Sequence, residues 1–164
     1  MTFPIRVTVR SVIIEQNALL CVEYEDESGL HYNLPGGGVE AGESLHEAVQ
    51  RETHEEANVR VEPGELLFII EYEPVRNRNW AEAGHTLCLI FAARMLPGQT
   101  QSLSARPDDY QTGVRWIPLS ELESVELLPH IDRFILQYAR GEGVFPMLLE
   151  EPIQPARAWR YLQS

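Results

Sequence analysis

The chain has 164 residues and a formal net charge of −12, from 25 acidic residues and 13 basic residues that are all arginine. Its length fits one domain, and 44% hydrophobic with 23% charged residues is typical of a globular protein. The acidic balance disfavours binding to nucleic acid or to an anionic membrane, because both attract basic surfaces. Two interpretations of the charge stay open, a solvated acidic surface and a site for cations.

The cysteines and the N-terminal residues indicate the cellular compartment. Cys21 and Cys88 lie in apolar, strand-like segments, which predicts buried thiols rather than a disulfide or a metal site. The first residues lack the long apolar core of a signal peptide, and no stretch has the length needed to span a bilayer. We therefore expect a cytoplasmic protein.

The N-terminal third predicts strands. Residues 5–15 and 18–25 are rich in alternating apolar residues and are separated by Gln16 and Asn17, which predicts a β-hairpin. Residues 31–34 predict a short third strand. The glycines at 36, 37 and 38, which follow Pro35, predict a break in regular structure.

After these glycines the periodicity becomes helical. Ser44 and Glu47 fit a capping box at the start of a helix. Leu45, Val49 and Thr53 then recur at four-residue spacing and predict its apolar face. Asn58 is expected to end this helix, because asparagine tolerates the left-handed conformation of a helix C-cap.

The second half of the chain predicts more strands, at residues 66–72, 86–95 and 113–117. A helical turn is expected at 118–122 and a helix over 129–140. His31 and His85 stand at strand starts, and the sequence indicates no partner for either.

The predicted central helix carries three glutamates on one face. Glu52, Glu55 and Glu56 are spaced three and four residues apart, so their carboxylates project from neighbouring positions. Because like charges repel, a compensating cation is expected, and Mg²⁺ takes carboxylate, carbonyl and phosphate oxygens. Arg51 is placed to pair with Glu55 and orient it. The glycine segment allows a backbone to approach a ligand closely.

This pattern closely resembles the signature box of the Nudix hydrolases. The matching positions span residues 37 to 59 and comprise Gly37, Glu43, Arg51, Glu52, Glu55 and Glu56. Thr53 and Asn58 depart from the family pattern, yet Thr53 keeps the bulk of an aliphatic residue and Asn58 keeps the helix cap. The resemblance implies an α/β fold, an α/β/α sandwich with a mixed β-sheet.

The resemblance also implies an activity and a site. Members of the family use Mg²⁺ or Mn²⁺ to hydrolyse a nucleoside diphosphate linked to another group. By position, the metal ligands are expected to be Gly37, Glu52, Glu55 and Glu56. Glu52, Glu55 and Arg51 are the expected catalytic residues, with Glu52 the first choice of proton acceptor. Family members differ in where the base lies, so Glu82 and Asp108 stay open for this role.

The substrate is less well determined by the sequence. Pro74, fifteen residues past Val59, resembles the position found in ADP-ribose-cleaving members. ADP-ribose or a nucleotide sugar is therefore the favoured small-molecule substrate. The alternatives are a nucleoside triphosphate pyrophosphohydrolase and a non-catalytic domain that senses a nucleotide. Arg76, Arg78 and Trp80 are candidates to bind phosphates and stack a base, or simply form an exposed loop.

The expected domain organisation is one Nudix domain over residues 1–140 followed by a tail over residues 141–164. Many relatives form dimers, so the tail is expected either to contact the neighbouring subunit of a homodimer or to act as a lid on the pocket. The residues alone do not choose between these two roles.

Overall fold

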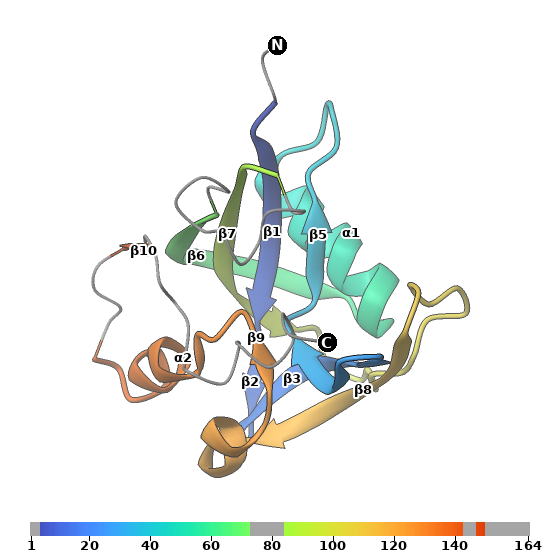
Figure 1. The fold of residues 1–164 in the computed structure, drawn as a ribbon, viewed down its shortest axis with the longest axis vertical. Helices are drawn as coiled ribbons and strands as arrows, with labels where there is room; N and C mark the ends of the chain where they lie inside the picture. Colours follow the sequence, from blue (N-terminus) through green and yellow to red (C-terminus); the bar gives the residue numbers. More distant parts are fainter. Residues whose placement is uncertain (1–3, 73–83, 143–146, 150–164) are drawn as a thin grey trace.

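The computed structural model describes residues 4–72, 84–142 and 147–149, and its strands form two sheets (Figure 1). The first sheet has the order β10-β6-β7-β1-β5. Its strands are β1 (Arg6–Val12), β5 (Gly36–Gly38), β6 (Val61–Tyr72), β7 (Thr86–Met95) and β10 (Leu148–Leu149). The second sheet contains β2 (Ile14–Glu15), β3 (Ala18–Asp26), β4 (Gly29–Asn33), β8 (Gln111–Pro118) and β9 (Leu127–Leu128). Each sheet contains parallel and antiparallel pairs and is therefore mixed.

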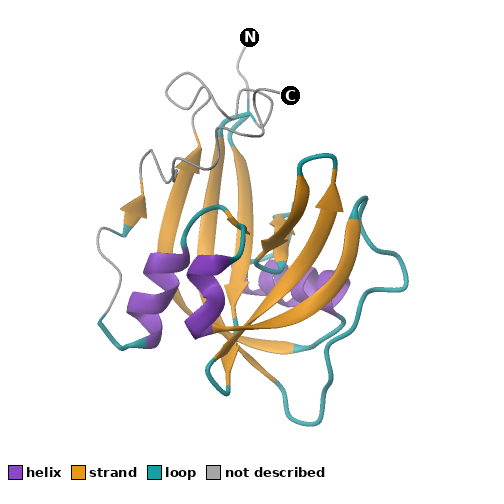
Figure 2. Cartoon of the chain, turned by 60° about the horizontal axis from the view of Figure 1, so that its bottom comes forward, coloured by secondary structure: helices purple, strands orange, loops and turns teal. Residues whose placement is uncertain are grey.

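Helices cover the sheets from two sides. Helix α1 (Leu45–Ala57) lies on one side, whereas helix α2 (Asp132–Ala139) and the 3₁₀ helix η2 (Leu119–Ser124) lie on the other (Figure 2). This arrangement confirms the expected α/β/α sandwich. In the described residues, no helix combines the length and the apolar character needed to cross a bilayer.

Alternation along β1 separates two apolar clusters. Val9 is fully buried and packs in one cluster with Ala48 and Val49 of α1. The other cluster includes Cys21, Cys88 and the apolar residues of α2. Both thiols are free and buried, as predicted, and burial raises the pKa of Cys21 to about 12. The Cys21 thiol is therefore protonated and inert at neutral pH.

One expectation about the N-terminal third was wrong, and another holds only in part. Residues Gly36–Gly38 do not end regular structure but form β5, which pairs with Thr8–Arg10 of β1. The expected hairpin shrinks to β2 and β3, whose turn at Gln16 and Asn17 has positive φ at both residues. The longer strand β1 ends at Val12 and pairs with β7 and β5 in the other sheet, while Ile13 lies between β1 and β2.

The predicted caps of α1 are present. The Ser44 hydroxyl accepts a hydrogen bond from the Glu47 N–H at 3.2 Å, and the Glu47 carboxylate accepts one from the Ser44 N–H at 2.7 Å. Asn58 ends the helix in the left-handed conformation, with φ 55° and ψ 32°. The helix that carries the glutamates is thus fixed at both ends by local sequence.

Removing the N-cap is expected to destabilise the protein modestly. Ser44→Ala leaves the Glu47 N–H without its side-chain acceptor and should lower the free energy of unfolding by about 1 kcal/mol. Urea unfolding in buffer without divalent cations measures the change. Ser44→Asp is the matched control, because aspartate also caps helices and should retain most of the stability. Equal urea midpoints for Ser44→Ala and the unmodified protein would contradict the assignment.

Candidate functional site

The three glutamates of α1 lie in different surroundings. The Glu55 side chain is 57% exposed and the Glu52 side chain 12% exposed, whereas Glu56 as a residue is only 7% exposed. Their positions along the helix direct the Glu55 side chain toward solvent and the Glu56 side chain toward Gly36, the first residue of β5. The three carboxylates therefore share one helix face, as the spacing predicted, but they differ in how deeply they are buried.

Arg51 connects the acidic groups of this face. Its guanidinium donates to both carboxylate oxygens of Glu43, at 3.0 and 2.6 Å, and to Oε1 of Glu52 at 2.8 Å. The expected pair with Glu55 is present at 3.2 Å, and the carbonyl oxygen of Gly38 accepts a further bond at 2.9 Å. These hydrogen bonds hold the pKa of Glu43 at about 2 and raise the pKa of Arg51. Arg51 thus fixes carboxylates from the loop and the helix relative to β5.

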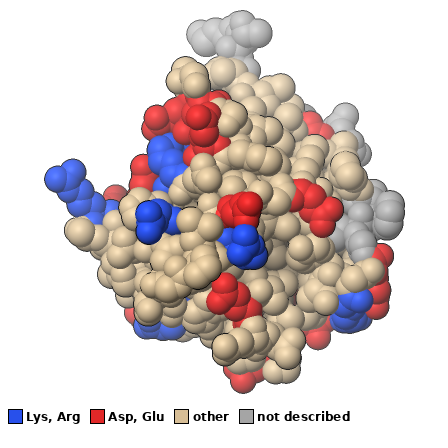
Figure 3. Space-filling view, turned by 180° about the vertical axis from the view of Figure 1, so that it is seen from behind, with Lys and Arg blue, Asp and Glu red and all other residues tan. Residues whose placement is uncertain are grey.

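Charges on one face of the molecule are mixed rather than segregated. On the face shown in Figure 3, acidic and basic side chains are interspersed over a largely uncharged surface. The −12 charge therefore does not gather into one continuous acidic face in this view.

Gly37 allows β5 to approach Glu52. A Cβ at this glycine would lie 2.5 Å from Oε2 of Glu52 and 2.6 Å from its carboxyl carbon, closer than atoms can stand. The absent side chain therefore lets the Glu52 carboxylate rest against the strand. Burial raises the pKa of Glu52, and the hydrogen bond from Arg51 opposes this rise.

Glu56 is held by β5 and β3. Its carboxylate accepts the Gly36 N–H at 2.8 Å and the Tyr24 hydroxyl at 3.3 Å. Burial raises the pKa of Glu56 to about 7, while the charge of Arg10 and the Gly36 hydrogen bond favour the ionised form. Neither Arg10, on β1, nor Tyr24, on β3, was predicted from the sequence to contact this glutamate.

The donor atoms suit a hard divalent cation, although they do not converge fully. Carboxylate and carbonyl oxygens are the ligands that Mg²⁺ prefers. Gly37 and Glu52 are brought together, but no three acidic, histidine or cysteine side chains of the described residues are grouped so as to hold a metal ion. Arg51 engages Glu52 and Glu55, and Glu56 faces Gly36. A cation bound here would compete with Arg51 for its carboxylates.

Of the remaining candidate residues, Asp108 alone lies within the described residues. Asp108 is exposed near the site, since its charge contributes, after burial, to the raised pKa values of Glu52 and Glu56. Glu82, the alternative base, lies outside the described residues. So do the proposed substrate residues Arg76, Arg78 and Trp80, and also Pro74.

Two histidines have partners that the sequence did not indicate. His85 lies 2.9 Å from Glu71, and the His31 ring stacks on Tyr24 with centroids 5.6 Å apart.

The departures from the family pattern are accommodated as expected. Thr53 is fully buried, and its hydroxyl lies 3.0 Å from that of Ser11, so the hydroxyl gains a hydrogen bond inside the core.

A family model for the NUDIX domain matches residues 4–138 of this chain. The chain belongs to the NUDIX family. It is also 28% identical over 142 residues to the human 8-oxo-dGDP phosphatase NUDT18. That match covers 85% of this chain and 40% of NUDT18, so the chain spans well under half of that relative's length.

Solved Nudix structures share the fold. A NUDIX hydrolase from Nitrosomonas europaea aligns with a TM-score of 0.70 and 20% identity over 92% of this chain and 82% of that one. The NUDIX domain of Shewanella oneidensis NrtR, crystallised with ADP ribose, aligns with a TM-score of 0.64 and 20% identity, covering 85% and 90%. An ADP-ribose pyrophosphatase from Streptococcus suis aligns with a TM-score of 0.60 and 20% identity, covering 84% and 93%.

Proposed function

We propose that this Nudix protein hydrolyses the pyrophosphate linkage of a nucleoside diphosphate joined to another group, with Mg²⁺ or Mn²⁺ as cofactor. The network around Arg51 carries the proposal, because it fixes Glu43, Glu52, Glu55 and the Gly38 carbonyl in one arrangement. Several like charges held together are costly unless a cation compensates them. A divalent cation held by these carboxylates would offset their repulsion and would neutralise a pyrophosphate for attack by water.

The residues have separable roles in this proposal. Gly37, Glu52, Glu55 and Glu56 would hold the metal, which supplies charge withdrawal from the phosphate oxygens and lowers the pKa of bound water. Glu52 would accept the proton from the attacking water, since burial raises its pKa toward the operating range of a base. Arg51 would orient Glu52 and Glu55, and Gly37 would keep the strand close to Glu52.

ADP-ribose or a nucleotide sugar is the substrate class that we favour. Pro74 supports it by its distance from Val59. Of the structural neighbours, one is an ADP-ribose pyrophosphatase and another was crystallised with ADP ribose. A nucleoside phosphate is the second candidate, because the human relative NUDT18 is an 8-oxo-dGDP phosphatase. A third candidate is a domain that binds a nucleotide without cleaving it.

A substrate panel tests these alternatives together. The full chain is incubated with Mg²⁺ or Mn²⁺ and with ADP-ribose, ADP-glucose, diadenosine polyphosphates, 8-oxo-dGDP and nucleoside triphosphates. Release of AMP from ADP-ribose or ADP-glucose supports the favoured class. Phosphate from 8-oxo-dGDP or pyrophosphate from a nucleoside triphosphate supports the second, whereas two nucleotides from a diadenosine polyphosphate support the general reaction but not the favoured class. Tight binding with no product from any compound would replace catalysis with sensing. The same mixtures with EDTA establish the metal requirement.

Crowding the Glu52 carboxylate should slow the reaction. Gly37→Ala places a methyl group within 2.5–2.7 Å of that carboxylate, so Glu52 must move away from β5. We expect kcat/KM to fall about tenfold, the effect common for groups that support metal ligands. Gly38→Ala is the matched control on the same strand, because its methyl group would meet only the end of the Arg6 side chain, at 3.2 Å. Equal losses in both variants would mean that the strand, not Glu52, is sensitive.

A further inference from the structure

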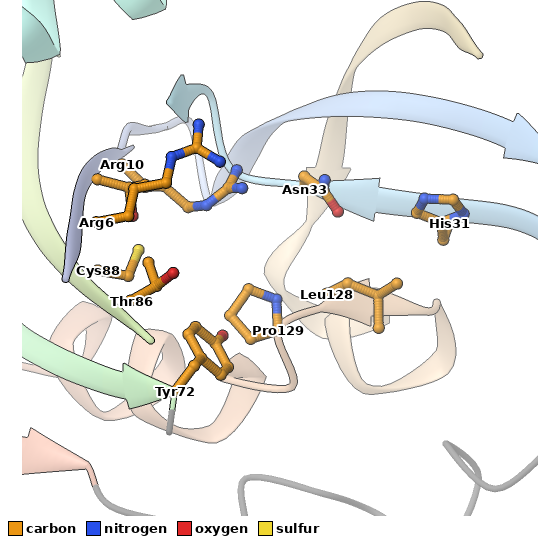
Figure 4. Close-up of a pocket in the computed structure, with 10 residues that line it drawn as sticks. Arg6, Arg10, His31, Asn33, Tyr72, Thr86, Cys88, Leu128 and Pro129 are labelled. Atoms are coloured by element: carbon orange, nitrogen blue, oxygen red, sulfur yellow. The ribbon is translucent and has the colours of Figure 1, made fainter. Parts of the chain in front are cut away.

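The segment between β7 and β8 contacts the C-terminal end of helix α1. The Ser102 N–H donates to the carbonyl oxygen of Ala57 at 3.1 Å, and the Gln111 side chain donates to the carbonyl oxygen of Glu56 at 2.8 Å. The last carbonyls of a helix have no partner within it, so both contacts satisfy groups that the helix leaves open. None of these four residues lines the polar cavity of about 460 Å³ that residues of β1 line (Figure 4).

Gln111, the first residue of β8, is buried, and both ends of its side-chain amide are bonded. The residue is 6% exposed. Its Nε2 donates to the Glu56 carbonyl, and its Oε1 accepts the backbone N–H of Asp108 at 3.2 Å. The backbone N–H of Gln111 donates in turn to the carbonyl oxygen of Asp108 at 3.0 Å and closes a turn over residues 108–111. One buried amide therefore joins the backbone of Asp108 to the backbone of Glu56.

Strand β3 holds the same turn from another side. The carbonyl oxygen of Tyr110 accepts the backbone N–H of Glu25 at 3.0 Å. Tyr110 has a φ of 66°, in the left-handed region that a tyrosine rarely adopts, and it is 65% exposed. Such a conformation persists only where its surroundings hold it. Because Tyr110 itself is largely exposed, the hydrogen bonds of the turn are the contacts that hold it.

The turn brings a carboxylate from a distant part of the chain to the helix glutamates. Burial is the main cause of the raised pKa values of Glu52 and Glu56, and the charge of Asp108 adds to both. Tyr24, which pairs with Gln111 between β3 and β8, donates its hydroxyl to the Glu56 carboxylate at 3.3 Å. Two paired residues thus contact Glu56, one at its carboxylate and the other at its backbone.

We propose that Gln111 is a positioning residue, which holds the Asp108 turn against the end of α1 and so keeps the Asp108 carboxylate beside Glu52 and Glu56. This inference rests on the proposed function, since the cation and the pyrophosphate are what these carboxylates would serve. A glutamine suits the task, because one amide carries both a donor and an acceptor. An apolar side chain there would leave the Asp108 N–H and the Glu56 carbonyl without this partner.

A double-mutant cycle tests the inference. Gln111→Met keeps an unbranched side chain of similar length but removes both hydrogen bonds. We expect kcat to fall about tenfold, with a smaller change in KM, as is common for groups that orient metal ligands. In the Asp108→Asn background the same substitution should have little further effect, because the charge that Gln111 positions is already absent. Gln99→Met is the matched control and should leave kcat unchanged, because the Gln99 amide also bonds backbone at both ends, but at Arg60 and Leu96.

Three results overturn the inference and leave the proposed function standing. The first is an unchanged kcat in Gln111→Met. The second is an equal fold-loss from Gln111→Met with and without Asp108→Asn, since Gln111 would then support only the end of the helix. The third is an equal loss in Gln99→Met, since the whole segment would then be sensitive. If urea unfolding shows that Gln111→Met does not fold, Gln111→Asn takes its place, because its shorter amide cannot reach both partners.

Binding of Mn²⁺ alone covers the case in which no substrate is cleaved. Electron paramagnetic resonance of the full chain measures free and bound Mn²⁺ without substrate. We expect the affinity to fall about three- to tenfold in Asp108→Asn and in Gln111→Met, with no further fall in the double variant, because both remove the same negative charge from the site. That result supports the positioning role even where the proposed hydrolysis fails. Affinity for Mn²⁺ that does not differ between Gln111→Met and the unmodified protein overturns it.

Discussion

Glu56→Gln is expected to lower metal-dependent kcat by about a hundred- to a thousandfold while leaving the fold intact. The carboxylate is 7% exposed and its pKa lies at about 7, so a neutral amide of the same shape resembles its protonated form. The amide oxygen can still accept the Gly36 N–H, but it carries no charge for a cation. Losing one preorganised charge contact in a site typically costs this much. Steady-state kinetics on the accepted substrate, with urea unfolding alongside, measure both effects.

The same substitution should change how stability depends on pH in EDTA. The pKa of Glu56 is raised from 4.5 in the unfolded chain to about 7 in the fold, so the folded state binds more protons between these values. The contribution of the protonated Glu56 carboxyl to stability is complete below pH 4.5 and is lost as pH rises through 7. Glu56→Gln should remove that decline. Glu123→Gln, at an exposed position of η2, is the control for the same charge change outside the site. Retained turnover in Glu56→Gln on every accepted substrate would remove Glu56 from the proposed metal site.

Local patterns predicted the helix and several strands well. The span of β7, Thr86–Met95, agrees with the prediction, and α1 begins and ends at the expected caps. These elements are determined by nearby residues, namely alternation for the strand and side-chain caps for the helix. The glycines at 36–38 were misread, because turn propensity is a local property whereas pairing with β1 is not. The first hairpin forms at the expected turn but is shorter than predicted for the same reason, since β7 supplies the partner of β1 from about eighty residues away.

In the candidate site, too, local spacing could be predicted from the sequence, whereas contacts between distant segments could not. Helical spacing predicted that Glu52, Glu55 and Glu56 share a region, and the pair between Arg51 and Glu55 was confirmed. The hydrogen bonds of Arg51 to Glu43 and Gly38 needed the path of the loop before the helix. Arg6, Thr8 and Arg10 alternate with valines on β1, and that period of two is a signal of a polar strand face. Only the fold shows that this face lines a cavity.

Arg51→Lys should reduce kcat/KM by about ten- to a hundredfold, and it tests whether geometry or charge matters at this position. The guanidinium reaches three glutamates and one carbonyl through Nε, Nη1 and Nη2. A lysine keeps the positive charge but has a single compact head, so it cannot reproduce the two parallel bonds to Glu43. Glu52 and Glu55 would lose their common donor, and residues that orient metal ligands typically contribute an effect of this size.

A pair of variants separates the two parts of the Arg51 network. Glu43→Gln removes the charged partner that Arg51 binds with two hydrogen bonds, but it leaves the bonds to Glu52 and Glu55. Its kcat/KM should therefore fall less than that of Arg51→Lys. If Arg51 acts by orienting ligands, the concentration of Mg²⁺ needed for half-maximal rate should rise in Arg51→Lys, and excess Mg²⁺ should restore part of the activity. Arg94→Lys is the matched control, because Arg94 pairs with Glu62 on the exposed surface of the strand pair β6–β7. A loss in Arg51→Lys that is independent of Mg²⁺ would assign Arg51 to the substrate rather than to the ligands.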